Sequence, residues 1–303
     1  MKLLITDTCH LTAEERAYLE GLGLEVIEAP DEAPYDGDPA EIDAIACKFL
    51  FSYAPIERFV NLKYVQLFMA GWDHVPMDYI RSHGIEFHNA RGVYSIPIAE
   101  FGIAGVLALY KKLRLFDSRQ RARIWEREPI LPELTGRHVL VVGAGSIGGE
   151  FAKRFRAFDC RITGLTRHVA PKEYFDDVRS LDDLDDVLPD ADIVIMCLPG
   201  NEDTRHIIDG RRFAMMKPDA IFVNVARGVL ADEAALVAAL ENGRLGGAVL
   251  DVFETEPLPE DNPLWAFENV IVLPHTSFGA QYNVRRSFEV MNRDLAGSAL
   301  LKG

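Results

Sequence analysis

The chain has 303 residues, of which 49% are hydrophobic and 26% charged, and its formal net charge is −15. This length accommodates two domains with separate hydrophobic cores, and the balance of residue types is typical of globular proteins. The acidic excess, without any block of Lys and Arg, argues against nucleic acid or an anionic membrane as a partner.

The cysteines and the apolar stretches indicate a cytoplasmic protein with reduced thiols. The four cysteines are far apart and form no C-x-x-C, so neither a disulfide framework nor a metal site is expected. The start of the chain becomes polar too early for a signal peptide. The longest apolar stretch, 96–110, contains Glu100 and is shorter than the about 20 residues that a membrane span requires.

The first part of the chain, up to about residue 95, alternates between short apolar runs and amphipathic segments. The alternation predicts a parallel sheet covered by helices on both faces. Strands are expected at 3–6, 24–27, 44–46, 64–68 and 85–88, and helices at 13–22, 55–59 and 77–83.

The turn after the fourth predicted strand contains Ala70, Gly71 and Trp72. Ligands of α/β sheets bind beyond the carboxyl ends of the strands, and small residues there leave backbone N–H groups accessible. We therefore expect Ala70, Gly71 and Trp72 to bind a substrate carboxylate, with an ordinary glycine turn as the alternative.

Two helices are expected to follow. The apolar stretch 96–113 predicts a buried helix that connects the two domains, and 114–127 predicts a charged helix with Ile124 and Trp125 on its apolar side. The charges are typical of a solvated face, whereas Trp125 is expected at a contact with another subunit or domain.

The middle of the chain contains an apolar run, 139–142, and then the pattern G-x-G-x-x-G at Gly143, Gly145 and Gly148. In a dinucleotide site these glycines permit a tight turn, a close approach of the pyrophosphate and close helix packing, respectively. The helix then begins at Ser146 and Ile147, whose N–H groups face the diphosphate. A purely structural turn is the alternative.

Further buried strands are expected at 161–165, 193–197, 221–225, 248–252 and 270–273, with a helix at 233–240. The acidic stretch 176–192 is expected to form a surface helix and loop. Together with the glycine motif, these elements predict a second doubly wound parallel sheet.

The cofactor's adenosine ribose lies at the end of the second strand of such a sheet, where an acidic residue favours NAD. This chain has Thr166, Arg167 and His168 there and no carboxylate. Because these side chains attract a 2′-phosphate, we expect NADP(H) to be preferred over NAD(H). In the alternative, Arg167 points to solvent and both cofactors are accepted.

Three polar residues follow predicted strands in the second half of the chain: Arg227, Glu256 and His275. Taken alone, each has an ordinary alternative: an Arg at a strand end often forms a surface ion pair, and a His after a proline often lies in a loop without a catalytic role. His74, His88, His138 and His206 lack this context and are expected to be structural or exposed.

These segments, in this order, resemble the D-isomer-specific 2-hydroxyacid dehydrogenase family over nearly the whole chain. The similar segments include 71–73, Ala99-Glu100, 134–136, Leu198-Pro199 with Thr204, and those around Arg227, Glu256 and His275. The resemblance implies an α/β protein of two doubly wound parallel-sheet domains. A flavodoxin-like substrate domain (1–98 with 277–303) and a Rossmann NAD(P)-binding domain (99–276) are expected, in a homodimer.

The resemblance also implies roles for single residues. His275 is the general acid for the substrate's carbonyl oxygen, Glu256 stabilises its imidazolium, and Arg227 binds the carboxylate and polarises the carbonyl. Asp251 and the Ala226 carbonyl hold the nicotinamide carboxamide. The remaining implied cofactor contacts are Leu198, Pro199 and Thr204.

The expected function is NAD(P)H-dependent reduction of 2-oxo acids to D-2-hydroxy acids. The bulky Trp72, with Phe49 to Phe51, Phe68 and Met69, favours a substrate with a small or apolar side chain. A glyoxylate or hydroxypyruvate reductase is the close alternative. A non-catalytic, dinucleotide-sensing protein on the same scaffold is the distant one, and formate or phosphite oxidation ranks lower still.

Overall fold

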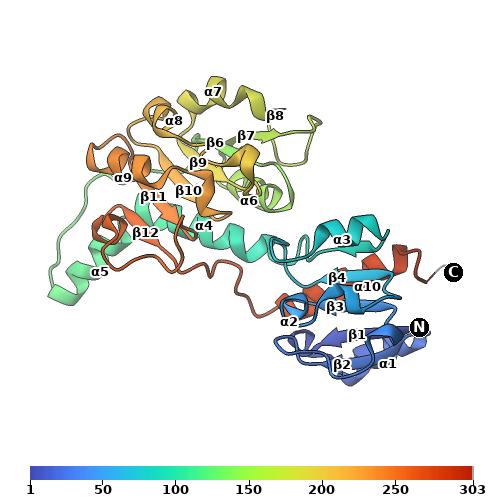
Figure 1. Ribbon diagram of the computed structural model, residues 1–303. Helices are drawn as coiled ribbons and strands as arrows, with labels where there is room; N and C mark the ends of the chain where they lie inside the picture. Colours follow the sequence, from blue (N-terminus) through green and yellow to red (C-terminus); the bar gives the residue numbers. More distant parts are fainter. Residues whose placement is uncertain (302–303) are drawn as a thin grey trace. The chain divides into compact units, whose positions relative to one another are not determined.

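The computed structural model describes residues 1–301, which form two compact units. One comprises Met1–Tyr94 together with the chain from Ala280 onward, and the other comprises Ser95–Gly279. The chain therefore returns to its first unit at the end: the last helix, red in Figure 1, lies with the blue N-terminal strands. The predicted boundaries, 98/99 and 276/277, lie within a few residues of these positions.

The first unit contains a parallel five-stranded sheet in the order β2-β1-β3-β4-β5, which is the flavodoxin-like order. Its strands are β1 (Lys2–Thr6), β2 (Glu25–Ala29), β3 (Ala44–Cys47), β4 (Tyr64–Leu67) and β5 (Glu86–His88). Side chains of β1 alternate between two cores: Leu3 and Ile5 pack on one face and Leu4 on the other.

Helices cover both faces of this sheet. The face of Leu3 packs against α1 (Ala13–Gly21) and α10 (Asn283–Gly297), and the face of Leu4 packs against α2 (Leu50–Tyr53) and α3 (Met77–Ser82). Short 3₁₀ helices complete the unit at η1 (Asp7–Cys9), η2 (Pro39–Glu41) and η3 (Ile56–Arg58).

The second unit contains a parallel seven-stranded sheet in the order β12-β11-β10-β9-β6-β7-β8. Its strands are β6 (His138–Val142), β7 (Arg161–Thr166), β8 (Asp177–Ser180), β9 (Ile193–Met196), β10 (Ile221–Asn224), β11 (Gly247–Leu250) and β12 (Val270–Val272). The order reverses between β6 and β9, so the crevice beyond their carboxyl ends is the place where a dinucleotide binds such a sheet. The predicted α/β class with two parallel sheets is confirmed.

One face of the second sheet is covered by α4 (Ser95–Tyr110) and α6 (Ser146–Arg156). These elements approach closely because α4 carries glycines: a Cβ on Gly102 would lie 2.5 Å from the Phe151 ring, and one on Gly105 would lie 2.5 Å from Val249 Cγ1. The apolar stretch predicted as a buried connecting helix is therefore a helix of this unit.

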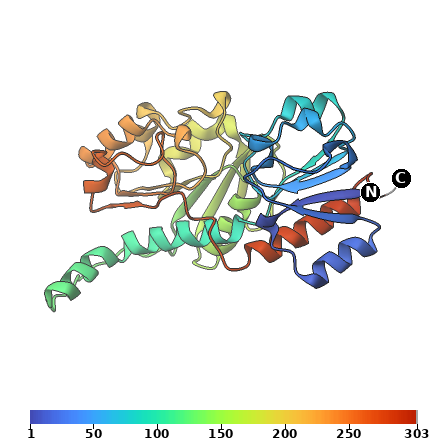
Figure 2. The same cartoon turned by 60° about the horizontal axis from the view of Figure 1, so that its bottom comes forward.

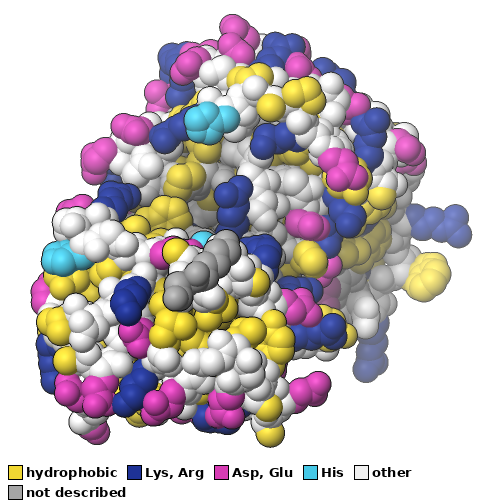
Figure 3. Space-filling view, turned by 90° about the vertical axis from the view of Figure 1, so that its right-hand side faces the viewer, with side chains coloured by type: hydrophobic (Ala, Val, Ile, Leu, Met, Phe, Trp, Pro, Cys, Tyr) yellow, Lys and Arg dark blue, Asp and Glu magenta, His cyan; other side chains and the backbone are white. Residues whose placement is uncertain are grey.

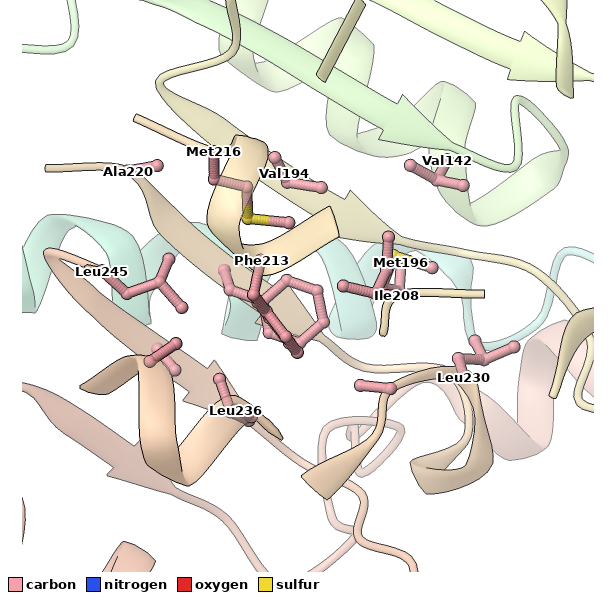
Figure 4. Close-up of a cluster of buried hydrophobic side chains, with 14 of the residues drawn as sticks. Val142, Val194, Met196, Ile208, Phe213, Met216, Ala220, Leu230, Leu236 and Leu245 are labelled. Carbon is pink, nitrogen blue, oxygen red and sulfur yellow. The ribbon is translucent and has the colours of Figure 1, made fainter. Parts of the chain in front are cut away.

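The opposite face is covered by α7 (Leu184–Val187), α8 (Gly210–Met215) and α9 (Glu233–Glu241). Figure 4 shows Phe213 of α8 at the centre of this core, surrounded by aliphatic side chains such as Val194 and Leu236. Its ring meets Phe222 edge-on, with the ring centroids 5.3 Å apart. The short 3₁₀ helices of this unit are η4 (Leu181–Asp183), η5 (Leu188–Asp190), η6 (Glu202–Thr204), η7 (Gly228–Leu230) and η8 (Pro263–Ala266).

The charged helix α5 (Leu113–Ala122) extends away from the sheet of its unit, as Figure 2 shows. It ends before the predicted Arg127, because Arg123 adopts a left-handed conformation with φ +57°. Ile124 and Trp125 therefore lie in the segment after the helix, and the Trp125 side chain is 96% exposed.

The surface carries charges of both signs. On the face drawn in Figure 3, Lys and Arg side chains (dark blue) are interspersed with Asp and Glu side chains (magenta). Among residues 1–301, no helix has the length and apolar character needed to cross a membrane.

Candidate active site

The predicted site residues of the second unit follow the carboxyl ends of its strands. Gly143 follows β6, Thr166 ends β7 and Leu198 follows β9, while Arg227, Asp251 and His275 follow β10, β11 and β12. Because the strands are parallel, these ends lie along the same edge of the sheet, where ligands bind.

The glycine turn between β6 and α6 fits a dinucleotide. Gly143 has φ +112°, and a Cβ there would lie 2.6 Å from the Cys197 backbone. A Cβ on Gly148 would lie 2.4 Å from the Gly143 carbonyl oxygen, so the helix starts directly against the turn. Around Gly145, in contrast, a Cβ would meet no described atom within 4 Å. The turn therefore leaves open space at the N-terminus of α6, where a pyrophosphate is stabilised.

The corner at the end of β7 contains an acidic group from another loop. Arg167 Nη2 lies 3.4 Å from Asp203 Oδ2, and both side chains are largely exposed. The Thr166 hydroxyl accepts a hydrogen bond from the His168 backbone N–H (3.4 Å). Arg167 thus lies at the predicted adenosine corner, where Asp203 partly compensates its charge.

The loop after β9 is held in shape by Thr204, which is 1% exposed. Its hydroxyl donates to the Pro199 carbonyl (2.8 Å) and accepts from the Asn201 N–H (2.9 Å). The observed bonds of Thr204 are therefore internal to this loop, which presents Leu198 and Pro199 at the edge of the sheet.

The turn that carries Arg227 is fixed by Asn224, the last residue of β10. The buried Asn224 amide donates to the Arg227 carbonyl (2.9 Å), and its oxygen accepts from the Ala226 N–H (3.2 Å). The half-buried Arg227 side chain donates from Nη1 to the Ala226 carbonyl (2.7 Å). Asn224 thus orients a cationic fork suited to a carboxylate.

His275 and Glu256 form an imidazole–carboxylate pair. His275 Nδ1 lies 2.7 Å from Glu256 Oε2, and Oε1 of the same carboxylate accepts from the Phe253 N–H (3.0 Å). The ionised carboxylate is an acceptor, so Nδ1 carries the proton. The opposite nitrogen, Nε2, then exchanges a proton whenever the ring changes its charge, as a general acid requires.

The backbone of His275 is anchored to Asp251, which is 1% exposed. The Asp251 carbonyl accepts from the His275 N–H (2.9 Å), and its carboxylate accepts from the N–H groups of Thr276 (2.8 Å) and Ser277. The Ser277 hydroxyl also donates to this carboxylate. These contacts stabilise His275 in its left-handed conformation, with φ +49°. In the structure Asp251 therefore organises the histidine loop.

The turn after β4 in the first unit presents Ala70, Gly71 and Trp72. The Ala70 carbonyl accepts from Asn89 Nδ2 (2.7 Å), and the Trp72 ring meets Phe87 edge-on. Within residues 1–301, the N–H groups of Ala70 and Gly71 have no hydrogen-bond acceptor. This turn can therefore bind an anion.

A hollow of about 340 Å³ lies beside this turn within the first unit. It is lined by Phe51, Pro55, Ile56, Glu57, Asp73, His74, Val75 and Pro76. Its walls combine apolar and acidic groups. Leu50 and Phe68, predicted near the substrate, are at most 1% exposed and belong to the cores of the unit.

Asn224 and Ser277, which orient Arg227 and His275, were not predicted from the sequence. A polar residue that ends an otherwise apolar strand, as Asn224 does, is the signal that could have identified it. Ser277 has no such signal, because its role depends on the distant Asp251. No cluster of His, Cys, Asp and Glu within residues 1–301 could hold a metal ion.

Comparisons with known proteins identify the family of the chain. Residues 103–277 match the family model described as D-isomer specific 2-hydroxyacid dehydrogenase, NAD binding domain. A glyoxylate reductase of Thermofilum pendens is 35% identical over 259 residues, which cover 80% of this chain and 73% of the relative.

Solved structures are similar over nearly the whole chain. A family protein from Aeromonas salmonicida has a TM-score of 0.82 at 30% identity and covers 97% of this chain and 94% of its own. One from Xanthobacter autotrophicus, in complex with NADPH and MES, has a TM-score of 0.78 at 28% identity, with 98% and 95% covered. The chain therefore belongs to the D-isomer-specific 2-hydroxyacid dehydrogenase family and is an NAD(P)-dependent oxidoreductase.

Proposed function

We propose that this dehydrogenase reduces small 2-oxo acids to D-2-hydroxy acids and prefers NADPH to NADH. The observation that supports catalysis most directly is the His275–Glu256 pair, 2.7 Å apart, in the same unit as Arg227 at the end of β10. Reduction of a 2-oxo acid requires a proton donor for the carbonyl oxygen and a cation for the carboxylate, and an imidazole with a carboxylate partner and a guanidinium group can fill these roles.

Each of these residues has one task in the proposed reaction. Arg227 binds the substrate carboxylate and polarises the adjacent carbonyl, and the N–H groups of Ala70, Gly71 and Trp72 provide further donors for the carboxylate. The nicotinamide dinucleotide, when bound, supplies the hydride. His275 gives the proton on Nε2 to the carbonyl oxygen, and Glu256 stabilises the imidazolium that precedes this transfer.

The proposed cofactor site consists of the glycine turn with Ser146 and Ile147 at the start of α6, and the loop of Leu198, Pro199 and Thr204. Asp251 and the Ala226 carbonyl are proposed to hold the carboxamide. Thr166, Arg167 and His168 support the preference for NADPH, since they place one permanent cation and two hydrogen-bonding groups at the adenosine corner. The relative from Xanthobacter autotrophicus is itself in complex with NADPH.

The proposed substrates are glyoxylate and other 2-oxo acids with a small side chain, and hydroxypyruvate is included as the next candidate. The similarity to a glyoxylate reductase supports this proposal, as does the bulky Trp72 in the proposed carboxylate-binding turn.

We further propose that the protein acts as a cytoplasmic homodimer. The segment after α5 exposes Trp125 (96%) and Ile130 (83%) on an arm whose shape is fixed by ion pairs of Glu128 with Lys112 and Arg119, both 2.8 Å. Such apolar exposure is typical of a surface that a second subunit covers. The cysteines are widely spaced in the sequence and form no C-x-x-C, which supports a reducing compartment.

Initial rates with pyruvate, 2-oxobutyrate, phenylpyruvate, glyoxylate and hydroxypyruvate, each with NADPH and with NADH, test this proposal. We expect glyoxylate with NADPH to be fastest and His275→Ala to lose roughly 100-fold or more in kcat. Faster turnover with NADH would contradict only the proposed role of Arg167 in cofactor preference, and the proposed reaction would stand. Binding of both cofactors without turnover of any acid would contradict catalysis and favour a dinucleotide sensor.

A further inference from the structure

A second histidine–carboxylate pair lies beside the turn that carries Glu256. His206 Nε2 lies 2.6 Å from Glu254 Oε1, and Glu254 precedes Glu256 by two residues. His206 follows η6 and adopts a left-handed conformation, with φ +48°. Two carboxylates of the turn 253–256 therefore contact histidines: Glu256 contacts His275, and Glu254 contacts His206.

Glu254 also joins this turn to the start of α9. Its backbone N–H donates to Glu233 Oε2 (3.1 Å), and its Oε1 accepts from the Glu233 N–H (3.4 Å). Glu233 is fixed in turn by Asn262, whose Nδ2 donates to Oε1 (2.7 Å). Glu254, whose carboxylate meets His206, is therefore tied to the start of α9 through two hydrogen bonds.

The same turn is packed tightly against the turn of Arg227. A Cβ on Gly228 would lie 1.9 Å from the Phe253 carbonyl oxygen, so the two backbones touch. The His206 N–H donates to the Val229 carbonyl (2.7 Å). His206 thus contacts one of these turns through its backbone and the other through its side chain.

The contacts of the turn 253–256 fix the position of Glu256, but they do not fix the backbone of His275. The His275 backbone is held by Asp251, outside the turn 253–256, whereas Glu256 is held by the Phe253 N–H within that turn. If the turn moved, Glu256 would therefore separate from an imidazole that stays in place. We propose that His206 and Glu254 are positioning residues that keep Glu256 within hydrogen-bonding distance of His275. The kinetic consequences of this proposal rest on the proposed function.

The first test observes the His275 ring directly and does not require turnover. In protein labelled with ¹⁵N-histidine, the resonance of the Nδ1 proton bound to Glu256 is assigned by its loss or shift in His275→Gln and Glu256→Gln. We expect this resonance to shift or broaden in His206→Ala and in Glu254→Ala. In Glu254→Gln, which keeps an acceptor for His206, the resonance should return to its wild-type position. Glu260→Ala is the matched control, because Glu260 is an exposed carboxylate of the following loop outside this network.

The second test is kinetic. A displaced partner of a general acid costs roughly tenfold to 100-fold in kcat, so we expect a loss of this size in both alanine variants, with the KM for NADPH within about twofold of wild type.

An unchanged His275 resonance in both alanine variants would overturn the proposal. So would a lowered Tm with an unchanged kcat, because that result assigns the pair a purely structural role. If wild type turns over no 2-oxo acid, the proposed function fails, but the resonance comparison still decides the inference.

Discussion

Individual polar side chains in the second unit act mainly by fixing backbone turns. Asn224 orients the turn of Arg227, Asp251 anchors His275, and Thr204 closes the loop after β9. Each is at most 2% exposed, and each hydrogen-bonds to backbone groups that would otherwise be buried without partners. Buried polar neighbours thus fix the turns that carry Arg227 and His275.

His138 is a buried residue whose protonation should lower the free energy of unfolding as the pH falls. Its ring contacts the Asp190 carbonyl (3.1 Å) and the Thr163 hydroxyl (2.9 Å), and burial lowers its pKa below the ordinary 6.5. Below about pH 6.5 the unfolded chain therefore binds a proton that the folded protein excludes, until the pH falls below the folded-state pKa.

We expect the free energy of unfolding to decrease over this interval by at most about 1.4 kcal/mol per pH unit through this group. Urea unfolding between pH 7.5 and 5 measures the effect, with His138→Gln as the comparison that cannot titrate. An equal loss of stability in His138→Gln would show that other groups cause it.

The elements of both sheets could be predicted because their strands are short, apolar and separated by helices. The strand β8 was missed because its residues, Asp177 to Ser180, are mostly polar and lie at the edge of the sheet. At the site, the resemblance to the family implied the roles of Arg227, Glu256 and His275. In contrast, Asp203 is brought beside Arg167 only by the folded loop after β9.

Helix α4 owes its close packing to glycines rather than to large apolar side chains. At Gly105 an added Cβ would lie 2.5 Å from Val249 Cγ1 and 3.3 Å from Val249 Cβ, on a buried strand that has little room to move. Gly105→Val should therefore reduce the free energy of unfolding by about 1–3 kcal/mol through overpacking. Ala104→Val, on the exposed side of the same helix, should cost only about 0.7 kcal/mol, which is the helix-propensity difference.

Denaturant unfolding of the two variants measures this difference. Equal stabilities would mean that α4 can shift away from β11 without cost. A larger loss in Ala104→Val would mean that the exposed side of α4 is covered in the assembled protein.

At the scale of the whole molecule, the arm formed by α5 and the following segment is the feature that a single chain does not explain. Glu128 is bound by both Lys112 and Arg119, which lower the pKa of its carboxyl group and fix the returning segment along α5. Exposure of Trp125 and Ile130 to water on a fixed arm is unfavourable, and a second subunit that covers this apolar surface would remove the cost.

If a second subunit covers the arm, Trp125→Glu combined with Ile130→Glu should convert the dimer to a monomer. Charges placed in an apolar interface lose their hydration without gaining a partner. Sedimentation velocity measures the change, and Val60→Glu, at an apolar residue of the first unit that is 67% exposed, should leave the dimer intact. A monomeric wild type, or a double variant that sediments like wild type, would contradict the proposed interface. A monomer that keeps its turnover would show that each chain forms a complete active site.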